Sequence, residues 1–319
     1  MLHSAQDLFR EGFILEAEIP AYEQVLARYR FRLPRYYANL IDKNDPLCPI
    51  RRQAIPSLEE MAAPAQGWSG DPLSDLKHRP VSRVTHRYPD RALLHLTTSC
   101  SMFCRYCFRK TLLNDWSPDF LSGEWKEAIL YFEKHPSIKE VIFSGGDPLM
   151  VSDAQLAMVL GQLRGIPHLK RIRFHTRVPV TYPSRITEEL CEVLVSSDMP
   201  TAIVTHFNHP KELTLESGAA CDRLRMMDIT LLNQSVLLRG VNDKPEILIS
   251  LSEELFEWGI LPYYLHHPDP AEGTGSFNVG REEGLAIEEE MRRRLPGYLV
   301  PRYVEDRVGE HHKRQVREL

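Results

Sequence analysis

Short apolar runs alternate with amphipathic stretches along most of the chain from Arg91 onward. Runs rich in β-branched and aromatic residues predict strands, and apolar residues at helical spacing predict helices. The predicted strands cover residues 92–97, 140–144, 171–175, 201–205, 230–238 and 262–266. The predicted helices between them cover residues 124–135, 153–164, 187–197, 216–227 and 245–259. This alternation favours βαβ units around a parallel sheet, and six units predict an α/β fold with a partial (β/α)6 barrel of the TIM type.

The first 90 residues follow a different pattern. A helical stretch at residues 21–29 is followed by a proline-rich passage from Pro46 to Pro89 that contains few clear strands. We therefore expect an N-terminal helical extension with a wrapping segment over residues 1–90. The barrel is expected over residues 91–280, and a C-terminal segment over residues 281–319.

Composition narrows the class of protein. Of the 319 residues, 43% are hydrophobic and 26% are charged, which is typical of a soluble globular protein. No apolar run approaches the roughly 20 residues of a membrane span, and the charged N-terminus does not resemble a secretory signal. The net charge of -5 gives no general attraction to nucleic acid or anionic lipid. We expect neither a nucleic-acid partner nor a membrane partner.

Three of the six cysteines, Cys100, Cys104 and Cys107, form a CxxxCxxC motif directly after the first predicted strand. Structural zinc sites usually take four protein ligands, and a ferredoxin supplies four cysteines to its cluster. Three thiolates on a four-iron cluster leave one iron open, which indicates a catalytic cluster. Two other cysteines, Cys191 and Cys221, lie in predicted helices and are interpreted as small buried hydrophobes.

The motif and its position after the first strand of a β/α barrel resemble the radical S-adenosylmethionine (SAM) superfamily. In that superfamily the open iron of a [4Fe-4S] cluster binds SAM, whose reductive cleavage yields a 5′-deoxyadenosyl radical. The segment FSGGDPL after the second predicted strand resembles the superfamily segment that holds the amino group of SAM. Taken alone, GGD is more often a tight turn. The residues of this segment with that implied role are Ser144, Gly145, Gly146 and Asp147.

A further resemblance extends from about Tyr36 to Lys313. The segments THRYPDRALLHLT, CSMFCRYCFRK, RVPVTYPSRIT, PYYLHHPDPAEG and GYLVPRYVED resemble the lysine 2,3-aminomutase family. The resemblance implies an isomerase that converts L-lysine to β-lysine with SAM and pyridoxal 5′-phosphate (PLP) as cofactors. It assigns the PLP-binding lysine to Lys313, although the surrounding glycine run of the family is reduced here to Gly309. The alternative is that Lys313 belongs to a solvated polar tail.

Other site residues are implied by the same resemblance. Arg87, Tyr88 and Arg91 match contacts to PLP, while His206, Asn208 and Gln234 lie where contacts to SAM or PLP are expected. For His206 a structural hydrogen bond is an alternative. Arg109 matches the residue that holds the substrate carboxylate, and a planar guanidinium suits that group. The two residues that match the site of the distal substrate ammonium are Asp269 and Asp306.

Several alternatives stay open at this point. The sequence also resembles relatives that supply β-lysine for elongation factor P, and the substrate could be another amino acid. A different class is a non-catalytic iron–sulfur protein. The free-lysine enzymes have a C-terminal extension with zinc-binding cysteines, which is not expected here, where Lys244 replaces one partner cysteine. We expect a cytoplasmic protein that is reduced by a flavodoxin- or ferredoxin-type carrier, and a homodimer is one open assembly.

Overall fold

The computed structural model describes residues 1–115 and 125–317, and it contains a sheet in which spatial order follows chain order. The nine strands are β1 (Val84–Tyr88), β2 (Arg91–Thr97), β3 (Glu140–Gly145), β4 (Arg171–His175), β5 (Thr201–Thr205), β6 (Thr230–Val236), β7 (Leu261–His266), β8 (Arg302–Glu305) and β9 (Arg314–Gln315). Strands β2 to β8 are parallel, and β1 and β9 are antiparallel edges. The six predicted strands form as β2 to β7, which confirms the partial barrel.

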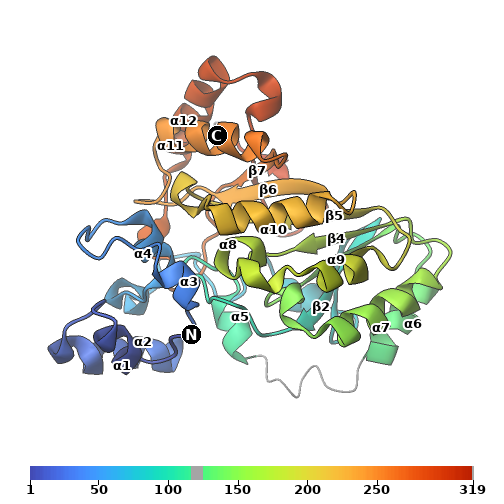
Figure 1. The fold of residues 1–319 in the computed structure, drawn as a ribbon, viewed down its shortest axis with the longest axis horizontal. Helices are drawn as coiled ribbons and strands as arrows, with labels where there is room; N and C mark the ends of the chain where they lie inside the picture. The colour runs from blue at the N-terminus through green and yellow to red at the C-terminus, as the bar shows by residue number, and fades with distance from the viewer. Residues whose placement is uncertain (116–124, 318–319) are drawn as a thin grey trace.

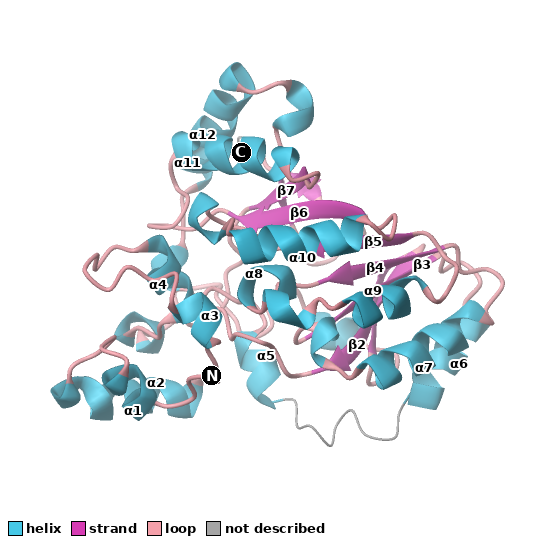
Figure 2. Ribbon diagram, viewed as in Figure 1, coloured by secondary structure: helices cyan, strands magenta, loops and turns pink. Residues whose placement is uncertain are grey.

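Helices connect successive parallel strands and cover the outside of the sheet (Figures 1 and 2). The helices from the barrel to the C-terminus are α5 (Lys110–Asp115), α6 (Trp125–Lys134), α7 (Asp153–Arg164), α8 (Val178–Thr181), α9 (Glu188–Val195), α10 (Leu215–Arg225), α11 (Pro245–Glu257) and α12 (Arg281–Arg294). Five of them were predicted, namely α6, α7, α9, α10 and α11. The predicted first residue of α6, Glu124, lies outside the described residues. At the start of α7 the Ser152 hydroxyl accepts a bond from Gln155 N at 3.3 Å, so this residue is the N-cap.

The core lies between these helices and the sheet. Phe143 of β3 stacks on Phe174 of β4 with ring centroids 4.5 Å apart, and both side chains are fully buried. Cys191 in α9 and Cys221 in α10 are both buried, which confirms that they pack as small hydrophobic side chains.

The N-terminal segment lies to one side of the barrel (Figure 1). It contains α1 (Ala5–Arg10), α2 (Ile19–Arg28), α3 (Arg35–Ala38) and α4 (Pro49–Ala54). Its backbone is bonded to the loop after β2: Phe103 N donates to Arg32 O at 3.2 Å, and Arg105 N donates to Gln53 O at 3.0 Å. The extension therefore supports the loop that contains the three cysteines. Strand β1 was not predicted, because it lies in the proline-rich passage.

The C-terminal segment folds back as a hairpin of β8 and β9. Val304 pairs with Gln315, and the single apolar residue that follows, Val316, is buried. Its connecting loop reaches β1, where Arg87 Nε donates to Glu310 O at 3.1 Å and His311 Nδ1 donates to Arg87 O at 2.5 Å. The hairpin loop thus lies across the open side of the barrel. Residues 318 and 319 of the predicted C-terminal segment lie outside the described residues.

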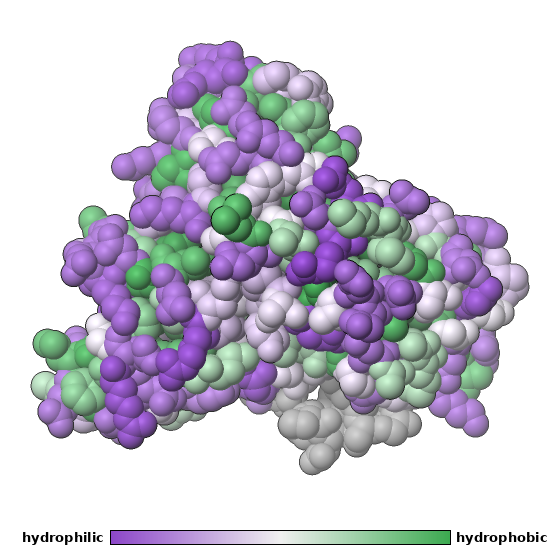
Figure 3. Space-filling model, in the orientation of Figure 1, coloured by the Kyte–Doolittle hydropathy of each residue, from purple (hydrophilic) through white to green (hydrophobic). Residues whose placement is uncertain are grey.

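The surface is mixed in character. Hydrophilic and hydrophobic side chains are interspersed on the face shown in Figure 3. In the described part of the chain, no helix has the length and apolar character that crossing a bilayer requires.

Candidate active site

The loop after β2 places Cys100, Cys104 and Cys107 together at the carboxyl end of the barrel, all as free, half-buried thiols. Burial raises the pKa of Cys100, and the nearby Asp147 and Cys107 raise it further. Burial and the neighbouring Cys104 raise the pKa of Cys107 to about 11. Binding a metal cluster here would release protons, since thiolates are the ligands.

The glycines after β3 allow this loop to approach the sheet. A Cβ on Gly145, whose φ is +125°, would lie 2.4 Å from Thr97 O, and a Cβ on Gly146 would lie 2.3 Å from Ser99 O. Gly146 N donates to Thr97 O at 2.6 Å, and Asp147 N donates to Ser99 O at 2.8 Å. The GGD segment therefore packs directly against the backbone of the cysteine loop. This close approach requires glycine at both positions.

The Asp147 carboxylate points into the protein rather than toward the thiols. It accepts bonds from Thr176 Oγ1 at 2.7 Å, from Arg177 N at 2.8 Å and from Leu149 N at 3.1 Å. Its carboxylate therefore orders the start of the loop after β4. Any contact of this segment with SAM would use its backbone groups or Ser144.

Arg109 is held rigidly two residues after the last cysteine. Its Nε donates to Asp75 Oδ2 at 2.7 Å, and its Nη1 lies 3.4 Å from Ser144 Oγ. Burial opposes the charge of Arg109, but the Asp75 carboxylate outweighs it and raises the pKa of Arg109. The cation is therefore permanent, and within residues 1–115 and 125–317 only Nε and Nη1 are bonded, so Nη2 is available to an anion. Asp75 belongs to the proline-rich passage, and sequence reasoning missed it.

Lys313 lies in the same site and is not part of a solvated tail. Its side chain is 22% exposed, its ammonium is bonded to Asp306, and it lies 5.8 Å from the centre of the Tyr264 ring. Burial opposes ionisation of Asp306, but the cations of Lys313 and Arg87 lower its pKa. Burial raises the pKa of Asp269 to about 7, and the charge of Asp306 adds to this effect. The two carboxylates are therefore close enough to repel each other.

Tyr88 and Arg87 contact this acidic group from β1. Tyr88 donates to Asp306 Oδ1 at 3.1 Å, and Arg87 Nη1 lies 3.6 Å from the same oxygen. Arg91 stacks its guanidinium 4.0 Å above the Tyr88 ring and pairs with Asp90. The structure thus brings together the three residues of the HRYPDR segment, with Arg91 at the outer side.

Histidines line the barrel beside Lys313. The Gln234 amide donates to His206 Nε2 at 2.6 Å, and burial lowers the pKa of His206 to about 3, so this ring is neutral. Burial also lowers the pKa of His175 and of His266. The buried Nε2 atoms of His175 and His266 have no hydrogen-bond partner among the described residues. Buried nitrogens without a partner beside a lysine suit a ligand with polar groups.

Comparison with known proteins agrees with this geometry. The radical SAM superfamily model matches residues 94–251. An L-lysine 2,3-aminomutase of Haemophilus influenzae is 41% identical over 295 residues, which cover 92% of this chain and 87% of that protein. The chain belongs to the L-lysine 2,3-aminomutase family. A relative of the same name from Fusobacterium nucleatum is 39% identical, covering 97% and 72%. Another from Escherichia coli is 40% identical, covering 89% and 82%.

Membership of the L-lysine 2,3-aminomutase family identifies the protein as a radical SAM isomerase and implies a [4Fe-4S] cluster, SAM and PLP as its cofactors. The described residues fit these groups. No three His, Cys, Asp or Glu side chains within the described ranges converge on one metal-ion position. A four-iron cluster instead needs its three thiolates on three different irons. The unpaired nitrogens of His175 and His266 next to Lys313 fit a PLP site.

Besides Asp75, His175 and His266, two further functional groups of this site were not found from the sequence. Arg177, in the quoted segment RVPVTYPSRIT, donates to Cys104 Sγ at 3.0 Å. Glu60, in the N-terminal extension, binds Arg105 of the cysteine loop and Lys110 at the start of α5. The residues that Arg177 and Glu60 contact come from distant segments of the chain. The sequence alone therefore does not indicate that either charged side chain belongs to the site.

Proposed function

We propose that the protein is an L-lysine 2,3-aminomutase that moves the amino group of L-lysine from C2 to C3. The observation that supports this most directly is the charge pattern around Lys313. Asp75 fixes the Arg109 cation, Lys313 is bonded to Asp306, and the charges of both Arg109 and Asp306 act on the Asp269 carboxyl. A substrate with a carboxylate at one end and an ammonium at the other matches this pattern.

The cofactor roles follow the family. We propose Cys100, Cys104 and Cys107 as the cluster ligands. When bound, the reduced cluster and SAM supply the radical that removes a hydrogen from the substrate, and PLP supplies the conjugated ring across which the nitrogen moves. The proposed contacts to SAM and PLP, besides Lys313, are Ser144, Gly145, Gly146, Asp147, His206, Gln234, Arg87, Tyr88 and Arg91.

Lys313 would hold PLP covalently, and its ammonium is paired with Asp306 in this structure. Asp306 and Asp269 are proposed to face the distal substrate ammonium. Arg109 is proposed to bind the substrate carboxylate, because Asp75 orients its guanidinium and leaves Nη2 for an anion. Glutamate would place a second negative charge against Asp269 and Asp306, so these residues favour lysine.

The cellular setting is also part of the proposal. An oxygen-sensitive cluster requires a reducing compartment, so we place the protein in the cytoplasm with a flavodoxin- or ferredoxin-type reductant. We further propose a homodimer. The proposed regions are an extension over residues 1–90, a barrel over residues 91–280 and a PLP-binding segment over residues 281–319.

The test is anaerobic incubation of the cluster-loaded protein with dithionite, SAM, PLP and single amino acids. The proposal expects β-lysine from L-lysine and no β-amino product from glutamate. A cysteine variant such as Cys104→Ala is the matched control and should form no product. Turnover of a different amino acid, with L-lysine untouched, would replace L-lysine as the substrate. No product from any amino acid would contradict the proposal.

A further inference from the structure

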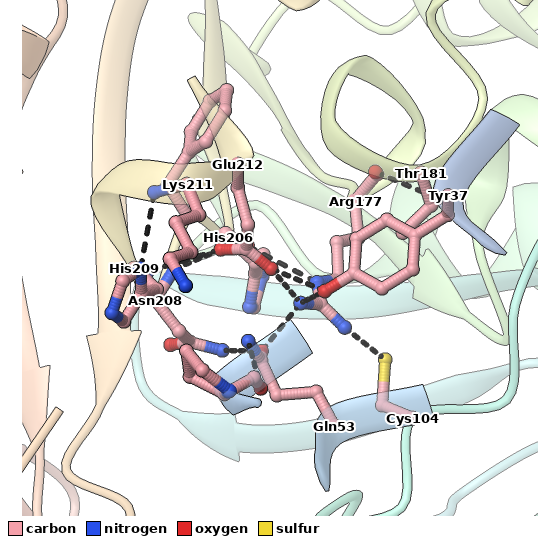
Figure 4. Close-up of polar contacts among 12 residues, drawn as sticks. Tyr37, Gln53, Cys104, Arg177, Thr181, His206, Asn208, His209, Lys211 and Glu212 are labelled. Carbon is pink, nitrogen blue, oxygen red and sulfur yellow. Dashed lines mark hydrogen bonds and ion pairs between the residues drawn. The ribbon is translucent and has the colours of Figure 1, made fainter. Parts of the chain in front are cut away.

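One buried polar network links the cysteine loop to three other parts of the chain, and Arg177 is at its centre (Figure 4). Arg177 follows β4 and is 7% exposed. Its Nη1 donates to Cys104 Sγ at 3.0 Å, and its Nε donates to His206 O at 3.2 Å. Its Nη2 donates to Gln53 Oε1 at 2.6 Å and to Glu212 Oε1 at 2.6 Å.

These bonds leave the guanidinium little freedom. A guanidinium has five N–H groups, and four of them point at the acceptors just given. Its backbone N is fixed as well, because it donates to Asp147. The orientation of Arg177 toward the Cys104 sulfur is therefore built into the fold and does not depend on a flexible side chain.

The counter-ion of Arg177 is equally fixed. Glu212 is fully buried and lies in the short helix Pro210–Glu212. Its Oε1 also accepts the Tyr37 hydroxyl at 2.5 Å, and its Oε2 accepts Asn208 N at 2.6 Å. A buried ion pair with this many supporting bonds holds one geometry, and breaking it would leave a buried charge uncompensated.

Two members of the network come from the N-terminal extension, Tyr37 in α3 and Gln53 in α4. Gln53 Oε1 accepts from both Arg177 and Asn208, and its backbone oxygen accepts from Arg105 of the cysteine loop. The extension therefore holds both the arginine and the loop that the arginine contacts.

We propose that Arg177 is a positioning residue that tunes the reduction potential of the iron–sulfur cluster through its N–H···S bond to Cys104. Reduction adds one electron to the cluster and increases the negative charge on its sulfur ligands. A charge-assisted hydrogen bond to one of these sulfurs is stronger in the reduced state than in the oxidised state. Arg177 therefore makes the cluster easier to reduce, and neither a proton nor a covalent bond changes place. The electron comes from the reductant of the proposed function.

The test compares two buried arginines of the cluster region. Arg177→Lys keeps a cation beside Glu212 but loses the planar fork that reaches Cys104. Arg105→Lys is the matched control, because Arg105 is also buried, lies inside the cysteine loop and pairs with a carboxylate, Glu60. The midpoint potential of the reconstituted cluster is measured by EPR-monitored reduction without PLP or lysine, after iron content has been checked for each protein.

Arg177→Lys is expected to lower the equilibrium constant for reduction about tenfold, which is about 59 mV for a one-electron couple. Arg105→Lys is expected to leave the potential within error of the wild type. An unchanged potential in Arg177→Lys, or an equal shift in both variants, would overturn the proposal.

A second measurement covers the case in which Arg177→Lys does not hold a cluster. Wild-type protein labelled with ¹⁵N-arginine is reduced, and the coupling of guanidinium nitrogen to the cluster is measured by pulsed EPR. A resolved ¹⁵N coupling supports the proposal, and its absence overturns it. The inference rests on the proposed cluster ligands but not on the amino acid substrate. A wild-type protein without any cluster would refute the ligand assignment, whereas an altered substrate would leave the potentials unaffected.

Discussion

Glu60 connects the N-terminal extension to the cysteine loop, and its removal should weaken both. Glu60 is 2% exposed and lies in the short helix Leu58–Met61. Its Oε1 accepts Arg105 Nε at 2.9 Å, and its Oε2 accepts Lys110 Nζ at 2.7 Å. Both cations are themselves buried, so one carboxylate compensates two buried positive charges.

Glu60→Gln keeps the shape and one acceptor oxygen but removes the charge. Breaking one side of a buried ion pair costs about 3–5 kcal/mol, because the remaining charge stays desolvated. We expect a loss of about 3 kcal/mol in the free energy of unfolding, since the amide oxygen still accepts one bond. Lys110 contributes to this loss, because burial already lowers its pKa to about 8 against the opposing effect of Glu60.

The assay is urea unfolding of the metal-free protein under reducing conditions, followed by tryptophan fluorescence. Glu59→Gln is the matched control, since Glu59 is exposed one residue away, and it should change the free energy by less than about 0.5 kcal/mol. Glu60→Gln should also bind less iron on reconstitution. A loss below 1 kcal/mol in Glu60→Gln, or an equal loss in both variants, would refute the reasoning.

Three further predictions concern the site. Lys313→Ala should abolish the visible absorbance of lysine-bound PLP, whereas the surface variant Lys134→Ala should retain it. Gly146→Ala should reduce iron binding at least tenfold, because the added Cβ would collide with the backbone of the cysteine loop. The control variant Gly161→Ala lies in α7 with open space around it. It should be tolerated or should raise the free energy of unfolding, measured with urea, by about 0.5–1 kcal/mol. The pKa of Asp269 is raised in the folded protein, so ionisation of this residue lowers the free energy of unfolding as the pH rises from about 4 to about 7. Asp269→Asn should therefore stabilise the metal-free protein by about 4 kcal/mol at pH 8, and the difference in unfolding free energy should disappear near pH 4.

The barrel strands could be predicted because each is rich in apolar or β-branched residues, either in a continuous run or, as in β4, alternating with polar residues. Strand β8 (Arg302–Glu305) and strand β9 (Arg314–Gln315) could not, because they have four and two residues and almost no pattern. The return of the tail depends on one buried side chain, Val316, and on long-range bonds such as the one from Val316 N to Tyr303 O. Local periodicity contains no information about such contacts.

In the active site, too, local sequence motifs could be predicted and long-range contacts could not. The cysteine motif and the GGD segment are local, so their neighbourhood could be expected from the sequence. The charges that orient the site come from remote segments: Asp75 holds Arg109, and Glu212 holds Arg177. Each pair is separated by more than 30 residues of chain, and only the folded structure brings its members together.

The most direct test of the central claim follows the nitrogen itself. Cluster-loaded protein is incubated with dithionite, SAM, PLP and L-lysine labelled with ¹⁵N at the α-amino group, and the product is analysed by NMR. The account predicts β-lysine with the ¹⁵N label on C3. No β-lysine from protein with full iron and PLP content, or β-lysine whose C3 nitrogen carries no label, would contradict it.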